Sequence, residues 1–393
     1  MSQIPVAKPV LDEQEVEAVR RVILSGWVTQ GPEVAAFEEE FADFVGARHA
    51  CAVSNCTTAL HLALRAVGVD AGDEVITVSH TFIATANAIR YCGAVPVFVD
   101  IEKDGYNIDP DLIEAAITPR TKAIICVHQL GMPCDLHRIV AVAARHSIPV
   151  IEDAACATGS EILWEGRWEK IGKPHGDIAC FSFHPRKVVT TGDGGMLTTA
   201  NAEYDRKFRL LRQHGMSVTD AVRHGSKQVI FESYPELGYN YRMTDMQAAV
   251  GREQLKRLPA IIARRREIAS QYAEQLCSTV DVMLPVEPAW ARSNWQSFCL
   301  QLPAYLDQRD IMQALLDRGI STRRGIMNIH LEDAYSEHGS HRVATSLKHS
   351  VAAQQHSIIL PLFAQMTGSD LTCVVDAIKT SVFTPHLAIE RVG

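Results

Sequence analysis

Short apolar runs alternate with amphipathic segments through the first half of the chain. Apolar residues recur at helical spacing over 11–26 and 33–46, which predicts two opening helices. Later runs predict strands at 50–54, 74–78, 95–99, 122–127 and 149–152. Helical patterns lie between or after them at 57–67, 82–91, from 109 onward, and at 136–146. This alternation predicts a mainly parallel sheet with helices on both faces.

The pattern changes after residue 178. Two strands are predicted at 178–183 and 195–199, joined by a loop too short to hold a helix. Helices are predicted at 204–213, 308–318 and 370–381, an extended segment at 295–302, and a long helix over 244–276 that is interrupted at Pro259. We place a domain boundary in this long helix, which gives a large domain, 1–255, and a smaller α/β domain, 256–393.

Composition and charge narrow the function classes. Hydrophobic residues make up 47% of the 393 residues and charged residues 21%, which is typical of globular proteins. The net charge of −8 argues against nucleic acid or an anionic membrane as the main partner. The sequence shows neither an apolar run long enough to span a bilayer nor a signal-peptide pattern, so we expect a cytoplasmic protein. The 10 cysteines form no C-x-x-C pair, which indicates free thiols rather than disulfides or a metal site.

Three segments at strand ends carry candidate chemistry: SNCTTAL (54–60), VIEDAACATGS (150–160) and FSFHPRKVVTTGDGG (181–195). Ligands of parallel sheets bind beyond the carboxyl ends of the strands. The third segment places Lys187 in an apolar loop closed by glycines. Burial lowers the pKa of a lysine and frees a neutral amine for Schiff-base chemistry. A solvated loop lysine is the alternative.

Residues in and near these segments could bind pyridoxal phosphate. Asp153 follows a strand, where its carboxylate could keep a pyridine nitrogen protonated; alternatively it caps a turn. Residues 54–58 open a helix whose N–H groups suit a phosphate, although an ordinary helix cap is the simpler explanation. Ser182 could add a phosphate hydrogen bond. Phe82 could stack on the cofactor ring or belong to the core.

Competing motifs are missing from the sequence. GDGGM lacks the last glycine of the dinucleotide-binding pattern G-x-G-x-x-G, and it precedes a strand instead of a helix. The sequence also contains no Walker A motif and no H-E-x-x-H zinc motif. A nicotinamide dehydrogenase would share the alternating strands and helices, but it would need that glycine pattern.

Together these segments resemble fold-type I pyridoxal phosphate enzymes of the aspartate aminotransferase superfamily. More narrowly, they resemble the DegT/DnrJ/EryC1/StrS family of sugar aminotransferases. The similarity extends over 25–46, 54–89, 97–136, 151–160, 182–195 and 236–258. It implies a large domain with a mostly parallel seven-stranded sheet and a smaller C-terminal α/β domain.

The resemblance also implies roles for individual residues. Lys187 would form the Schiff base, and Asp153 would pair with the pyridine nitrogen. The other implied cofactor contacts are Phe82 on the ring, Cys156 near the phenolic oxygen, and Cys56, Thr57 and Ser182 on the phosphate. Asn240 would reach the phosphate of the neighbouring subunit, which implies a homodimer with shared active sites. Candidate substrate contacts are Trp27, Thr29, His330 and Arg324.

Two departures from the family pattern concern cysteines. Cys156 stands where the family usually has Gln or His, and a thiol is a weaker hydrogen-bond partner. Cys56 stands where glycine is common. Residues 293–303 and 319–335 also depart from the usual pattern, and this region helps to shape the substrate pocket in the family.

The expected reaction is ping-pong transfer of an amino group from glutamate or glutamine to a keto group of a nucleotide-linked keto-deoxy-sugar. Lys187 would move the proton between the donor Cα and the cofactor C4′. A keto-cyclitol is the alternative substrate. A non-catalytic, cofactor-binding regulator is the alternative from another class, and Cys156 is the feature that favours it. A dehydrating branch of the family has histidine in place of this lysine, so Lys187 argues against that branch.

Overall fold

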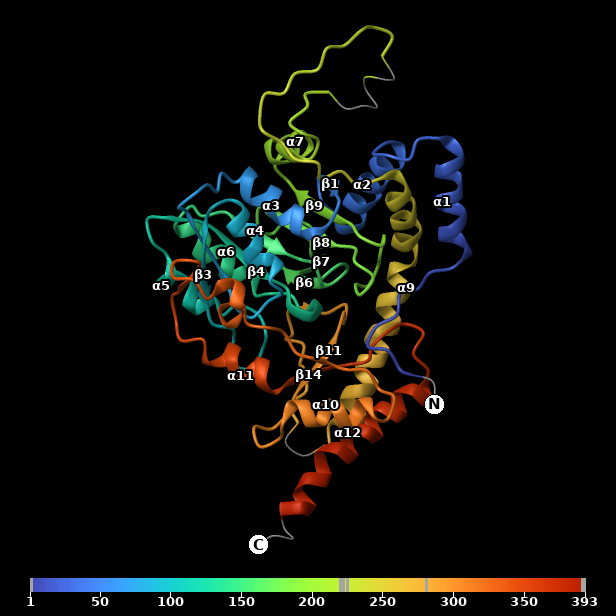
Figure 1. Cartoon of the computed structure of the whole chain (residues 1–393), viewed down its shortest axis with the longest axis vertical. Coiled ribbons are helices and arrows are strands. Elements are labelled where there is room, and N and C mark those ends of the chain that lie inside the picture. Colours follow the sequence, from blue (N-terminus) through green and yellow to red (C-terminus); the bar gives the residue numbers. More distant parts are fainter. Residues whose placement is uncertain (1–2, 219–222, 224–225, 280–281, 390–393) are drawn as a thin grey trace.

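The computed structural model describes residues 3–218, 223, 226–279 and 282–389. An eight-stranded sheet forms its centre, in the order β1-β9-β8-β5-β4-β2-β3-β13 (Figure 1). Its strands are β1 His49–Val53, β2 Glu74–Val78, β3 Val95–Val99, β4 Thr121–Val127, β5 Val150–Asp153, β8 Ile178–Ser182, β9 Gly195–Thr199 and β13 Arg342–Val343. Strand β9 runs antiparallel to both of its neighbours, and the other neighbouring pairs are parallel. The mainly parallel sheet and its seven expected strands are confirmed, and β13 from the C-terminal part adds an eighth.

Helices lie around this sheet (Figure 1). They are α1 Glu13–Ser25, α2 Pro32–Val45, α3 Cys56–Ala66, α4 Ala84–Tyr91, α5 Ile113–Ala116, α6 Leu136–Arg145, α7 Ala202–Leu211 and α9 Asp245–Leu276, with 3₁₀ turns at Pro110–Leu112 and Gln129–Gly131. Helix α4 begins two residues later than predicted, so Phe82 precedes it. Helix α3 begins with a capping box in which Asn55 and Thr58 bond each other's backbone N–H groups.

Two three-stranded sheets complete the strands. One contains β6 Glu161–Trp164, β7 Arg167–Lys170 and β10 Ala291–Arg292, and the other contains β11 Phe298–Gln301, β12 Arg323–Arg324 and β14 Ser357–Leu360. The C-terminal helices are α10 Gln308–Leu316, α11 Lys348–His356 and α12 Gly368–Ile389, with 3₁₀ turns at Ile329–Leu331 and Asp333–Tyr335. Within the described residues, no helix is both long and apolar enough to cross a membrane.

Helix α9 continues through Pro259, so the predicted interruption is wrong. A proline inside a helix removes one hydrogen bond and costs about 3 kcal/mol. Leu258, Ile261 and Ile262 are buried around this position. Burial of each such side chain stabilises by roughly 1.5–3 kcal/mol, so packing outweighs the cost of the proline.

Two hydrophobic cores meet along α9. The first surrounds the central sheet and includes Ile262. The second includes Ile268 and Tyr272, joined by side chains of the C-terminal strands and helices and by Ile4 from the other end of the chain. The division into 1–255 and 256–393 stays a prediction, while the two cores divide within α9 between Ile262 and Ile268.

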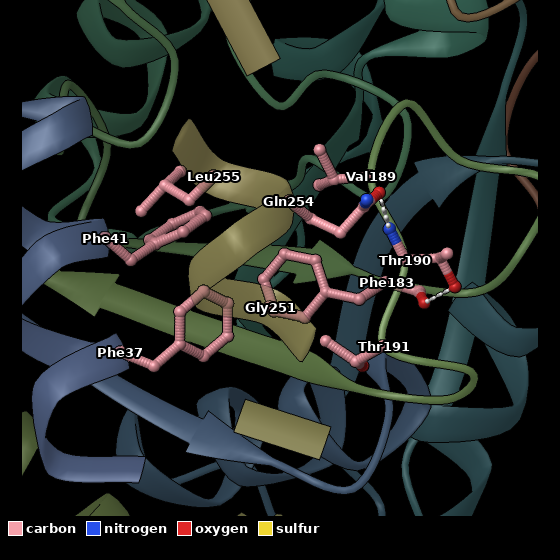
Figure 2. A pocket seen from close by; sticks show the side chains of 9 residues that line it. All are labelled: Phe37, Phe41, Phe183, Val189, Thr190, Thr191, Gly251, Gln254 and Leu255. Atoms are coloured by element: carbon pink, nitrogen blue, oxygen red, sulfur yellow. Dashed lines mark hydrogen bonds between the residues drawn. The ribbon is translucent and has the colours of Figure 1, made fainter. Parts of the chain in front are cut away.

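The loop that carries Lys187 is packed into the first core at both ends. Phe183 and residues 189–191 of this loop lie against phenylalanines of α2 and against α9, with no room for a water molecule between them (Figure 2). Thr190 Oγ1 donates to Phe183 O at 2.8 Å, and Thr190 N donates to Gln254 Oε1 at 3.4 Å. A Cβ on Gly251 would lie 2.7 Å from the Phe37 ring, so only glycine lets α9 approach this closely. The base of the loop is therefore firmly held.

Candidate active site

The three segments with candidate chemistry, 54–60, 150–160 and 181–195, meet at one edge of the central sheet. Strands β1, β5 and β8 run in the same direction, so their carboxyl ends share this edge. Asp153 is the last residue of β5, Ser182 is the last residue of β8, and α3 begins shortly after β1. The structure thus places the segments together, as expected from parallel strands.

Lys187 lies beside Cys156 in this edge. The Lys187 Nζ atom donates to Cys156 Sγ at 3.1 Å, and the side chain is half-buried. Burial opposes charge on the amine, but the neighbouring sulfur atoms of Cys156 and Cys56 and the Asp153 carboxylate outweigh it, so the pKa of Lys187 is raised. Burial does act to lower this pKa, as the sequence argument states, but the net direction is the opposite because the argument left out these three neighbours.

Asp153 is buried and held by two donors. Thr85 Oγ1 donates to Asp153 Oδ2 at 2.9 Å, and Ala155 N donates to Oδ1 at 3.2 Å. Burial raises the pKa of Asp153, although both hydrogen bonds and the charge of Lys187 act in the opposite direction. A cation placed against this carboxylate, such as a protonated ring nitrogen, would stabilise its ionised form.

Phe82 occupies the turn that leads to Thr85. Its carbonyl accepts from Thr85 N at 3.2 Å, yet the side chain is 63% exposed. The alternative that Phe82 belongs to the core is therefore wrong. An exposed aromatic ring one turn before Thr85, which bonds the buried Asp153, fits the face of a planar ring whose nitrogen meets that carboxylate.

The start of α3 has donors suited to an anion. Cys56 and Thr57 are its first residues, and the first N–H groups of a helix have no partner within the helix. Gly195 lies opposite Ser182 on the neighbouring strand, and a Cβ there would lie 2.8 Å from Cys56 N. Glycine at this position keeps Ser182 and the helix start close together. Burial and the charge of Asp153 raise the pKa of the Cys56 thiol, while Lys187 lowers it.

Among the candidate substrate residues, His330 lies at the carboxyl end of β2. Its Nδ1 atom is 2.7 Å from Ser79 Oγ, and its backbone N–H donates to the same oxygen at 3.0 Å. Burial and the nearby His341 lower the pKa of His330, so it is neutral at pH 7. His330 thus bonds Ser79, which directly follows β2 and precedes Phe82 by three positions.

The remaining candidates have contacts elsewhere. Trp27 Nε1 donates to Gln30 O, and Thr29 O accepts from Asp245 N at the start of α9. Arg324 is exposed and lies 3.5 Å from Glu332. Asn240 is exposed and forms a β-bridge with Gln213. None of these contacts reaches Lys187 or Asp153, and the roles of these four residues stay predictions.

Comparison with known proteins agrees with this geometry. The sequence profile of the DegT/DnrJ/EryC1/StrS aminotransferase family matches residues 9–379. The chain belongs to this family. It is 38% identical over 383 residues to the spore coat polysaccharide biosynthesis protein SpsC of Bacillus subtilis (strain 168), covering 96% of this chain and 97% of SpsC.

Solved structures of aminotransferases are similar over almost the whole chain. The aminotransferase TlmJ from Streptoalloteichus hindustanus has a TM-score of 0.88 and 32% identity, covering 97% of this chain and 99% of TlmJ. The PLP form of Spr1654 from Streptococcus pneumoniae has a TM-score of 0.88 and 27% identity, covering 97% of this chain and 98% of Spr1654. The protein is therefore an aminotransferase with the fold expected from its sequence.

The sequence alone did not point to several residues that shape this candidate site. Thr85 holds Asp153, and its position in the HTFIAT segment, next to the expected ring-stacking Phe82, is a signal that could have found it. Fully buried Asn294 donates to the carbonyl oxygens of Cys156 and Thr158. Its partners lie more than 130 positions away, so no local pattern marks it.

A buried pair lies behind Asp153. His128 Nε2 is 3.0 Å from Glu152 Oε2, and both side chains are fully buried. Cys134 N donates to His128 Nδ1 at 2.9 Å, so the proton is on Nε2 and faces the carboxylate. Hydrogen bonding to His128 keeps the pKa of Glu152 low despite its burial. The pair supports the strand ends at which Asp153 lies.

Proposed function

We propose that this aminotransferase uses pyridoxal 5'-phosphate to move an amino group from glutamate or glutamine to a keto group of a nucleotide-linked keto-deoxy-sugar. The observation that supports it most is the placement of Lys187 beside Cys156, with Asp153 buried at the same sheet edge. The Spr1654 structure in its PLP form supports the choice of cofactor.

The residues present fit this cofactor. Lys187 would hold its aldehyde carbon, Asp153 its ring nitrogen, and Phe82 one face of its ring. Cys156 would lie toward its phenolic oxygen, and Ser182 with the first N–H groups of α3 would hold its phosphate. When bound, pyridoxal phosphate supplies an electron sink for the amino acid Cα.

Lys187 would act as the proton carrier of the reaction. Its Nζ atom would take the proton from Cα of the donor and deliver it to C4′ of the cofactor. Asp153 would keep the ring nitrogen protonated throughout. The side chain of Phe82 is exposed at this edge and is therefore free to cover one face of the cofactor ring. Covering that face would exclude water from it.

The keto-sugar part of the proposal is supported by SpsC, whose name refers to polysaccharide biosynthesis. A neutral His330 at the sheet edge could accept or donate a hydrogen bond to a sugar hydroxyl. Incubation of the loaded enzyme with L-glutamate and either a nucleotide-linked keto-sugar or a keto-cyclitol tests the substrate class. We expect 2-oxoglutarate and an aminated nucleotide sugar by mass spectrometry. Amination of the cyclitol alone would contradict the proposed substrate, and inertness toward every donor would favour the non-catalytic regulator.

We also propose a homodimer with shared active sites. Residues 226–238 extend away from the rest of the described chain (Figure 1). Val229, Phe231 and Leu237 on this arm are 85%, 90% and 89% exposed, which favours burial against another chain. Asn240 lies two residues after the end of the arm, and the carbonyl of the next residue, Tyr241, accepts from Ser54 N at 2.8 Å near the start of α3.

Mixed dimers test whether Asn240 serves the partner's site. Lys187→Ala and Asn240→Ala subunits are dissociated and reassembled together. Half of the dimers are then hybrids, and each hybrid has one intact site, so we expect about a quarter of wild-type activity. If Asn240 serves its own subunit, the mixture shows no gain over the average of the two parents. An active monomer in sedimentation would also contradict the shared site.

A further inference from the structure

Residues 293–296, here called the strap, connect the C-terminal part of the chain with both loops of the active site. Asn294 Nδ2 donates to Cys156 O and Thr158 O, each at 2.9 Å, and Asn294 N donates to Ser160 Oγ at 3.0 Å. Gln296 Nε2 donates to Arg186 O at 3.0 Å, next to Lys187. The strap thus bonds the turn after Asp153 and the loop before Lys187 at the same time.

The strap is itself fixed by two neighbouring arginines of α9. Buried Arg265 donates to Trp295 O at 2.8 Å and to Gln296 O at 2.5 Å. Arg266 Nε donates to Ser293 O at 2.9 Å. Three of the four strap carbonyls, all except that of Asn294, are therefore held by α9, the helix that packs into both hydrophobic cores.

Backbone conformation shows how tightly this segment is determined. Trp295 has φ +49°, in the left-handed region that a bulky residue rarely adopts. Gly131 packs against Asn294 so closely that a Cβ there would lie 2.0 Å from Asn294 Oδ1. Such strain persists only where the surroundings impose it, and it is concentrated at functional sites.

We propose that Asn294 is a positioning residue that keeps the Cys156 sulfur against the Lys187 amine. Its two side-chain hydrogens fix the turn of residues 156–158, and this turn sets the contact of 3.1 Å between Sγ and Nζ. The strap thereby makes the geometry at Lys187 depend on α9 and the C-terminal part of the chain. The consequence for the cofactor rests on the proposed function, whereas the consequence for the Cys156 turn does not.

Asn294→Asp tests the positioning role with almost no change in shape. A carboxylate has no hydrogen to donate and faces two carbonyl oxygens, so the turn should open. We expect iodoacetamide to label Cys156 at least about tenfold faster in the full chain without cofactor, as measured by peptide mass spectrometry, because local opening limits the reaction of a partly buried thiol. Exposed Cys277 provides the internal reference rate.

In the protein loaded with pyridoxal phosphate, we expect the pH midpoint of the cofactor absorbance to shift in Asn294→Asp by about one unit. If Asn294 acts through the sulfur, the same substitution has no further effect on this midpoint in a Cys156→Ala background. Ser293→Ala is the matched control, because among the residues that the structure describes the Ser293 hydroxyl bonds only Trp295 N of the strap itself, at 2.9 Å. It should leave the labelling rate and the midpoint unchanged.

Asn294→Ser keeps one hydrogen-bond donor, so Cys156 should be labelled at an intermediate rate in this variant. Asn294→Ser replaces Asn294→Asp in the experiment if Asn294→Asp does not fold. A wild-type rate of Cys156 labelling in both variants would overturn the proposal. An equal shift of the pH midpoint by Asn294→Asp in the presence and in the absence of Cys156 would also overturn it. A wild-type protein that binds no pyridoxal phosphate would instead contradict the proposed function. The labelling result stays interpretable in that case.

Discussion

We expect Lys187→Ala to abolish amino transfer while leaving the fold intact. Lys187 would both hold the cofactor and move the proton, and loss of a group with these roles costs at least about 10⁴-fold in rate. The substitution removes one hydrogen bond to a sulfur atom and a half-buried side chain. The free energy of unfolding should therefore change by less than about 1 kcal/mol.

Lys122→Ala is the matched control for this prediction. Lys122 is an exposed lysine near the beginning of β4, at the opposite edge of the same sheet. It should retain wild-type rates. Measurement of 2-oxoglutarate formation from glutamate, with thermal unfolding in parallel, checks both variants. Near-normal turnover by folded Lys187→Ala would refute the assignment of Lys187.

Asp153→Asn should slow amino transfer about 10²–10³-fold, which corresponds to an electrostatic loss of roughly 3–4 kcal/mol. Asparagine has the same shape and can still accept one of the two hydrogen bonds from Thr85 Oγ1 and Ala155 N. It has no negative charge to keep a ring nitrogen protonated. The loss should therefore appear in kcat and leave the fold in place.

Steady-state kinetics with glutamate measures this effect, and the unfolding transition confirms that the variant is folded. Asp153 already caps the turn after β5 through Ala155 N. If the rate falls less than about tenfold, this cap is its whole role, and the cofactor interaction proposed for it is wrong.

The local pattern of apolar residues was sufficient to predict most strands of the central sheet. Each parallel strand is a short apolar run followed by a helical segment, and burial on both faces makes that pattern strong. Strand β13 could not be found in this way, because two residues, Arg342 and Val343, carry no periodicity and are ordered by pairing with β3. The hairpin of β6 and β7 is similar, since β6 also depends on β10 from a distant part of the chain.

The candidate site was predictable where one residue type in a short motif determines the chemistry. Lys187 and Asp153 belong to such motifs, and the sheet topology places both at one edge. Asn294 depends on contacts between distant segments, which the sequence order does not indicate. The raised pKa of Lys187 was missed for the same reason, because it depends on Cys156, Cys56 and Asp153, which are neighbours only in the folded structure.

The central claim is that Lys187 and pyridoxal phosphate form a working aminotransferase site. The most direct test is the absorption spectrum of the purified protein loaded with pyridoxal phosphate, recorded before and after addition of L-glutamate or L-glutamine. We predict a yellow protein whose visible absorbance bleaches with the donor and returns when a keto acid is added. A protein that binds the cofactor and stays yellow with both donors, or that binds none, would contradict the claim.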